Sequence, residues 1–154
     1  MKKTDRISDF VKDLAAESAG TGDFDARYSG YFVCFNRGDY YEAHDVLEDL
    51  WLQTDGSDYA FYKGLIQIAG AFVHLKKQHA RPTHPKDGRR LAPASRLFLL
   101  GQKNIAPFAP LHHRLDVTDL IRFCAIHYSA ICESNCQINP WNPESLPQLT
   151  LEID

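Results

Sequence analysis

The sequence predicts an all-α protein, a small helical bundle of about five to six helices with an irregular Pro-rich C-terminal tail. Nearly every segment repeats its apolar residues at helical spacing, and no stretch alternates apolar and polar residues for long enough to predict a strand. A length of 154 residues, with 44% hydrophobic and 24% charged residues, is typical of one folded domain. We therefore expect a single helical-bundle domain over residues 1–154, with its core at about 24–133 and an extended tail at 134–154.

Three helices are predicted in the N-terminal third of the chain. The first is amphipathic and is indicated by four apolar residues that share one face, Ile7, Phe10, Val11 and Leu14. Asp25 is expected to cap the second helix, and Gly38 to end it as the residue after its C-cap. Asp39 and Glu42 have the spacing of a capping box, which would open the third helix.

A turn at residues 54–57 precedes the longest predicted helix, at roughly residues 58–78. The apolar residues of this helix cover more than half of its circumference, so we expect it to be central and packed on several sides. The remaining sector carries one row of polar or small residues: Lys63, Gln67, Gly70 and His74.

Prolines divide the second half of the chain. An irregular loop at residues 78–88 leads to a helix through residues 96–100, which Pro93 should open or kink. Pro107 and Pro110 interrupt the chain again, and Asp116 is expected to begin the last helix. The tail from Asn139 contains too many prolines for a helix and is expected to lie along the surface.

Composition and charge exclude several classes of function. A net charge of −3 and a pI near 6.1 give no basic surface for nucleic acid or anionic lipid. The charged first residues do not resemble a secretory signal, and the most apolar segment, residues 64–73, is too short to span a membrane. The four cysteines match no zinc-binding spacing and are expected to be reduced thiols. We expect a cytoplasmic protein with no nucleic-acid or membrane partner, and a homo-oligomer stays open.

The candidate site is a histidine and a carboxylate, His44 and Glu48, four residues apart on the predicted third helix. Such a pair can share a proton, hold a metal ion or orient a ligand. In an enzyme, His44 would be the general base and Glu48 would orient it. If the row on the central helix faces this pair, Gln67 would bind the substrate and His74 would join the pocket. The alternative is a buried polar pair that only specifies helix packing.

Other polar residues have simpler interpretations. Glu42 is explained first by the capping box, and Trp51 is expected in the core. Asp45 and Asp49 fall on the charged side of their helix and are expected to face solvent. Four histidines match no zinc template and are read as surface residues: His79, His84, His112 and His113. No motif specifies a metal, a cofactor or a reaction.

The stretch Phe35 to Trp51, followed by Tyr62 to Gln67, closely resembles the domain-of-unknown-function family 309. The hallmarks are a Phe-Asn-x-Gly step, a Glu-Ala-His-x-x-x-Glu-x-x-Trp helix and a Gly-Leu-Ile-Gln helix. The resemblance implies a small helical bundle with no established activity. It also implies six signature polar positions: Asn36, Glu42, His44, Glu48, Trp51 and Gln67. Asn36, Glu42 and Trp51 thereby become candidate ligand-binding residues beside the pair and Gln67.

These features support two hypotheses. The first is a small-molecule or metal-ion site in the bundle, centred on His44, Glu48 and Gln67. The second is a non-catalytic interaction or structural module, in which the same cluster only specifies how the helices pack.

Overall fold

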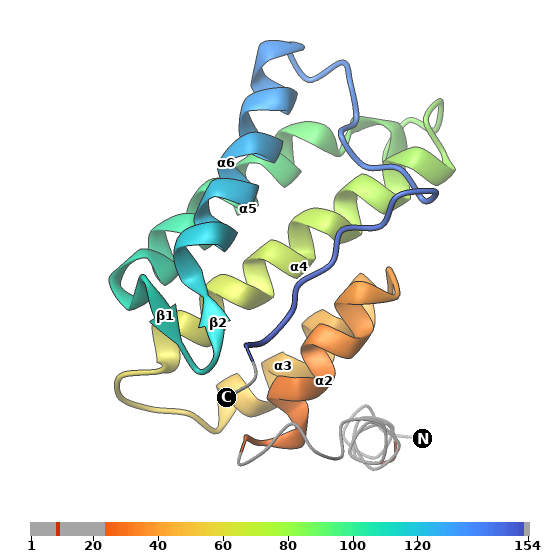
Figure 1. The fold of residues 1–154 in the computed structure, drawn as a ribbon. Helices are drawn as coiled ribbons and strands as arrows, with labels where there is room; N and C mark the ends of the chain where they lie inside the picture. Colours follow the sequence, from red (N-terminus) through yellow and green to blue (C-terminus); the bar gives the residue numbers. More distant parts are fainter. Residues whose placement is uncertain (1–8, 10–23, 153–154) are drawn as a thin grey trace.

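The computed structural model describes residue 9 and residues 24–152, and within them it confirms the all-α architecture (Figure 1). The α-helices of this part of the chain are α2 (Ala26–Asn36), α3 (Tyr40–Leu52), α4 (Tyr59–Ala80), α5 (Leu91–Ile105) and α6 (Val117–Glu133). Two short 3-10 helices, η1 (Asp87–Arg89) and η2 (Ala106–Phe108), flank α5. The helix predicted around Ile7, Phe10, Val11 and Leu14 lies outside the described residues. None of the described helices is long and apolar enough to cross a membrane.

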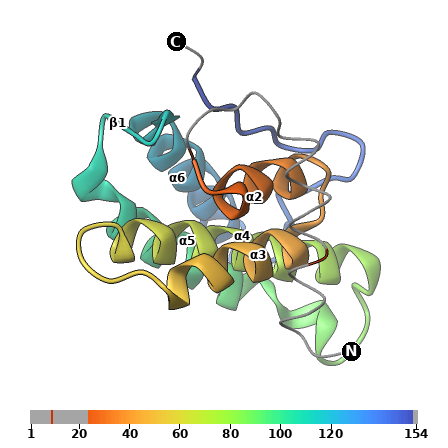
Figure 2. The ribbon, with the colours of Figure 1, turned by 90° about the horizontal axis from the view of Figure 1, so that it is seen from below.

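The central helix is α4, as its wide apolar arc predicted. Both α3 and α5 pack along α4, while α2 lies on α3 and α6 lies on α5 (Figures 1 and 2). Phe72 of α4 connects these layers. Its ring makes edge-to-face contacts with Phe35 of α2 and Phe98 of α5, each at 5.2 Å, and stacks on Tyr40 of α3 at 5.1 Å. The aromatic core therefore joins four helices around one residue of α4.

Gly38 ends α2, as predicted, in a left-handed conformation with φ of +82°. The N–H of Gly38 donates to the carbonyl of Phe35, and the N–H of Asp39 donates to the carbonyl of Cys34, which is the Schellman pattern. The capping box predicted from Asp39 and Glu42 is wrong, because Asp39 makes no side-chain cap hydrogen bond. In a capping box, the glutamate side chain accepts a hydrogen bond from the backbone N–H of the cap residue. Here the N–H of Asp39 already donates to the carbonyl of Cys34 at the end of α2.

The helix starts predicted at Asp25 and Asp116 are confirmed. Asp25 accepts a hydrogen bond from the backbone N–H of Arg27 at 2.9 Å, and Asp116 accepts one from the N–H of Asp119 at 2.9 Å. Pro93 lies in the first turn of α5, where a missing N–H costs no helical hydrogen bond.

A small hairpin, which the sequence analysis did not predict, connects η2 to α6. Strand β1 (Leu111–His112) pairs antiparallel with β2 (Leu115–Asp116), and each strand is too short to show an alternating pattern. The two turn residues, His113 and Arg114, have φ of 46° and 63°.

The C-terminal tail is extended, as predicted, and runs across the helices from the end of α6 to the hairpin (Figure 1). The expectation that it lies on the surface is wrong for Trp141 and Leu149, which are buried in the core. The Nε1–H of Trp141 donates to the hydroxyl of Tyr40 at 2.8 Å. Their burial makes the tail a structural part of the bundle.

Candidate functional site

His44 and Glu48 lie together on α3, and both are partly exposed. The His44 Nε2 atom is 3.8 Å from Oε2 of Glu48, which is an ion-pair distance but too long for a hydrogen bond. On the other side of the ring, Nδ1 is 3.1 Å from Oδ1 of Asp45. The imidazole therefore lies between two carboxylates of its own helix.

The expectation that Asp45 and Asp49 face solvent is wrong. Asp45 is buried with 8% of its surface exposed, and it holds the imidazole of His44. Asp49 makes a 2.7 Å ion pair with Arg27 of α2. The helical wheel could not show the Arg27–Asp49 ion pair, because it does not show that α2 packs on this side of α3.

Gln67 and His74 have their polar partners at α5 and not at α3. Oε1 of Gln67 accepts a 2.7 Å hydrogen bond from Nδ2 of Asn104 in α5. The Nδ1 atom of His74 is 3.0 Å from Nη1 of Arg90, the residue before α5. Burial, and then the nearby Arg90, lower the pKa of His74. Among the described residues, no hydrogen bond or ion pair links these two side chains to His44 or Glu48.

The remaining signature residues are separate from this pair. Asn36 of α2 binds the tail: its amide Nδ2 donates to the carbonyl of Leu149, and its Oδ1 accepts from the N–H of Leu149. The Trp51 ring packs against Tyr59 at 5.0 Å, and its buried Nε1–H has no hydrogen-bond partner in the described part of the chain. Glu42 is exposed.

A groove of about 570 Å³ lies between the start of α3 and the end of α4. Tyr41 and Glu42 line it from α3, and Val73 and Lys77 from α4. The Tyr41 ring is half exposed and has two polar neighbours: the imidazole of His44, nearly parallel at 6.4 Å, and the ammonium of Lys77 at 6.0 Å. Tyr41 therefore connects the groove to the candidate pair.

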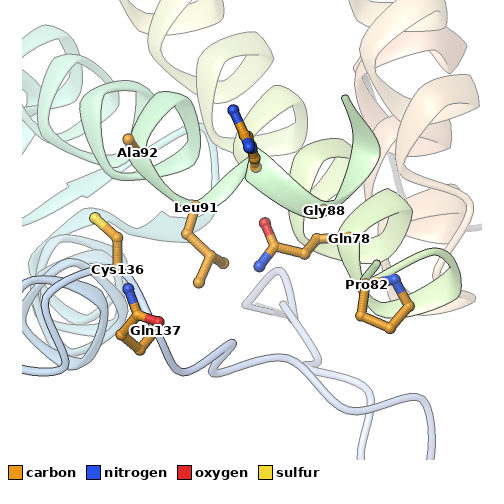
Figure 3. A pocket seen from close by; sticks show the side chains of 8 residues that line it. Gln78, Pro82, Gly88, Leu91, Ala92, Cys136 and Gln137 are labelled. Carbon is orange, nitrogen blue, oxygen red and sulfur yellow. The ribbon is translucent and has the colours of Figure 1, made fainter. Parts of the chain in front are cut away.

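A second hollow, of about 440 Å³, opens where the loop after α4 meets the end of α6 (Figure 3). Gln78, Leu91 and Cys136 lie around it. Oε1 of Gln78 accepts a 2.7 Å hydrogen bond from the backbone N–H of Arg90, so this amide also ties α4 to the start of α5.

Asp58 forms a second cluster with His112 and His113 of the hairpin. Each carboxylate oxygen is 2.8 Å from one Nε2 atom, Oδ1 from His112 and Oδ2 from His113. Burial raises the pKa of Asp58, but the hydrogen bonds from His113 and His112 outweigh it and leave the pKa below its usual value. These histidines were expected at the surface, and each side chain is partly exposed, at 28%, but the prediction missed that both contact Asp58. Asp58 is 54 residues from His112, so no local pattern could have indicated the cluster.

The fold and these clusters define a small all-α protein with two candidate polar sites. One lies on α3 around His44, and the other lies where the residue before α4, Asp58, meets the β1–β2 hairpin. Residues 28–84 match the family model described as Domain of unknown function (DUF309), which confirms the predicted resemblance over that segment. The matched segment includes His44, Glu48 and Asp58, while His112 and His113 lie beyond it. No curated protein and no solved structure matches the chain.

Proposed function

We propose that the protein binds a small organic acid with a flat, apolar body in the groove between α3 and α4, and that the ligand extends past Tyr41 to reach His44 beside the groove. The observation that supports this proposal is the position of His44, held by Asp45 at 3.1 Å while Nε2 lies 3.8 Å from Glu48. An imidazole fixed on one side keeps its other nitrogen available to a ligand.

The groove supplies the chemistry for the rest of the ligand. The half-exposed ring of Tyr41 offers a stacking surface, and Val73 offers an apolar wall. The ammonium of Lys77, 6.0 Å from the Tyr41 ring, can bind an acidic group.

His44 can also act as a base in this arrangement. If Nδ1–H donates to Asp45, the lone pair of Nε2 is exposed, which is the tautomer a general base requires. Glu48 would then attract the imidazolium that forms when Nε2 takes a proton from a bound molecule. Gln67 does not contribute to this site, because its Oε1 accepts a hydrogen bond from Asn104 of α5.

The test is a titration of ¹⁵N-labelled protein with benzoate and, as a neutral analogue, benzamide. We expect saturable shifts of the Tyr41, His44 and Lys77 signals, stronger with benzoate. His44→Ala and Lys77→Ala should each weaken benzoate binding about tenfold or more, whereas Lys103→Ala, at an exposed lysine of α5, should leave it unchanged.

Circular dichroism of each variant separates lost binding from lost fold. If neither compound shifts these signals, and His44→Ala and Glu48→Ala mainly unfold the bundle, the pair has only a packing role and the proposal fails.

A further inference from the structure

We propose that Asp58, His112 and His113 form a binding site for one divalent transition-metal ion of the zinc type. This site shares no residue with the groove between α3 and α4, so the two proposals succeed or fail separately.

The three side chains already converge. One ligand atom from each, a ring nitrogen of either histidine and a carboxylate oxygen, can be chosen so that all lie within 4.8 Å of one another. Zinc binds imidazole nitrogen at about 2.0–2.1 Å, so two such ligand atoms of a tetrahedral site lie about 3.4 Å apart. Two atoms at the outer limit of 4.8 Å would have to approach by about 1.4 Å, which a shift of about 0.7 Å in each side chain would provide.

The carboxylate of Asp58 is directed at the histidines. Asp58 occupies the N-cap position of α4 but makes no side-chain cap hydrogen bond there. An aspartate at this position usually accepts a hydrogen bond from the first turn of its helix. Here both carboxylate oxygens bind imidazole Nε2 atoms, at 2.8 Å each.

Aromatic residues hold both histidines in place, His112 through its ring and His113 through its backbone. The His112 ring packs edge-on against Phe61 at 4.7 Å and lies tilted against Phe108 at 4.8 Å. The hydroxyl of Tyr28 donates to the carbonyl of His113 at 2.8 Å. Rigid outer partners of this kind orient metal ligands and limit the loss of entropy when an ion binds.

The backbone of the hairpin turn also fixes His113. His113 and Arg114 both have positive φ, at 46° and 63°, in a two-residue turn that usually contains asparagine and glycine. Histidine adopts this conformation more often than most non-glycine residues, whereas a bulky residue such as Arg114 rarely does. This turn places the second imidazole beside the first, with ring centroids 4.0 Å apart.

The ligand set determines the class of ion. Two imidazoles and one carboxylate favour zinc, cobalt, nickel or ferrous iron over magnesium and calcium, which prefer oxygen ligands. Three protein ligands leave at least one coordination position for water, as in catalytic zinc sites. The side chains of the cluster are 27–28% exposed, so an ion and its water can reach them.

The experiment titrates the full-length, untagged, metal-free protein with Co²⁺, followed by visible absorption, and with Zn²⁺, followed by calorimetry. Cys132→Ser and Cys136→Ser are present in every sample, because both thiols are exposed and can bind these ions. We expect one ion per chain, displacement of Co²⁺ by Zn²⁺, and a higher melting temperature with Zn²⁺.

Three substitutions test the ligands while keeping their surroundings. Asp58→Asn keeps the shape of the side chain, His112→Phe keeps the aromatic packing, and His113→Asn suits a positive φ. Each should weaken Co²⁺ binding at least about tenfold and remove the Zn²⁺-dependent rise in melting temperature. His79→Ala, at an exposed histidine, should change neither.

Two results would overturn the proposal: no saturable Co²⁺ binding by folded protein, or binding that all three folded variants retain. If one variant unfolds, the other two decide the question, because each removes a different ligand.

Discussion

His127 of α6 shows how strongly one residue's surroundings decide its chemistry. Its ring lies beside Phe72, Phe98 and Phe123, with centroid distances of 5.2, 5.5 and 4.4 Å. Burial lowers the pKa of His127, although the hydrogen bond to the Phe123 carbonyl opposes this. The folded protein therefore disfavours the charged form of this histidine.

This pKa shift predicts a loss of stability in mild acid. The pKa of a histidine in the unfolded chain is about 6.5. Below that pH the unfolded chain binds a proton that His127 in the folded protein does not bind as readily, so the free energy of unfolding decreases as pH falls. Above that pH the contribution is fully present. His74 acts in the same direction, because burial lowers its pKa as well.

The measurement is urea unfolding at pH 8.0 and 5.5, followed by circular dichroism. His127→Phe should lose less stability than the wild type between these two pH values, while His79→Ala should lose as much. Equal losses in His127→Phe and the wild type would show that His127 does not contribute.

For single residues, the sequence predicts contacts within a helix better than contacts between segments. The His44–Glu48 pair could be predicted because four residues along a helix bring two side chains to one face. The partners of Gln67 and Asn36 could not, because they lie 37 and 113 residues away along the chain.

At the scale of elements, α4 and α5 approach each other closely where two glycines meet. A Cβ atom on Gly64 would lie 2.6 Å from a methyl carbon of Ile105 and 3.0 Å from the carbonyl oxygen of Gly101. A Cβ on Gly101 would lie 2.7 Å from Ile68. These helices can pack this closely only because neither glycine carries a side chain.

Gly64→Ala is therefore expected to destabilise the protein by about 1–3 kcal/mol, because the new methyl group overpacks the interface. Gly70→Ala, on the same helix, is the matched control. Its Cβ would meet only the mobile end of Leu97, at 3.3 Å, and alanine favours the helix by about 0.8–1 kcal/mol.

Urea unfolding of the two variants checks this difference. Gly70→Ala should be neutral or stabilising and Gly64→Ala clearly destabilising. Equal changes in the free energy of unfolding of the two variants would contradict the argument that the contact between α4 and α5 has no room for a side chain at Gly64.

For the whole molecule, the C-terminal tail joins elements that are far apart in the sequence. The amide of Asn139 donates to the carbonyl of Leu75 in α4, Trp141 binds Tyr40 of α3, and Leu149 binds Asn36 of α2. The N–H of Glu152 reaches the carbonyl of Arg114 in the hairpin turn. The bundle is therefore closed by a segment without regular secondary structure.

Trp141→Ala should lower the free energy of unfolding by about 3–5 kcal/mol, because it removes a large buried side chain. Trp141→Phe should cost about 1–3 kcal/mol, since mainly the hydrogen bond to the buried hydroxyl of Tyr40 is lost. Ile138→Ala, at a residue that is 65% exposed in the same tail, is the control.

Urea unfolding and limited proteolysis report on both changes. Earlier cleavage of the tail in Trp141→Ala than in Ile138→Ala is expected. A tail that is cleaved equally in both variants, with unchanged stability, would contradict a structural role for Trp141.

Local patterns in the sequence were enough to predict the described α-helices, most of their ends and the central position of α4. Apolar spacing, the Asp25 and Asp116 caps and the Gly38 ending depend on residues within about four positions of one another, so a local pattern contains them. The family resemblance over residues 28–84 was recognisable for the same reason.

Which polar side chains meet depends on how the helices, the hairpin and the tail pack together. Packing brought Asp58 to His112 and His113, placed Gln67 at α5 rather than at α3, and buried Trp141 of the tail. These contacts join segments that are tens of residues apart, and their geometry depends on how whole helices pack. Helical periodicity indicates which face of a helix is buried, but it does not identify the partner that covers that face.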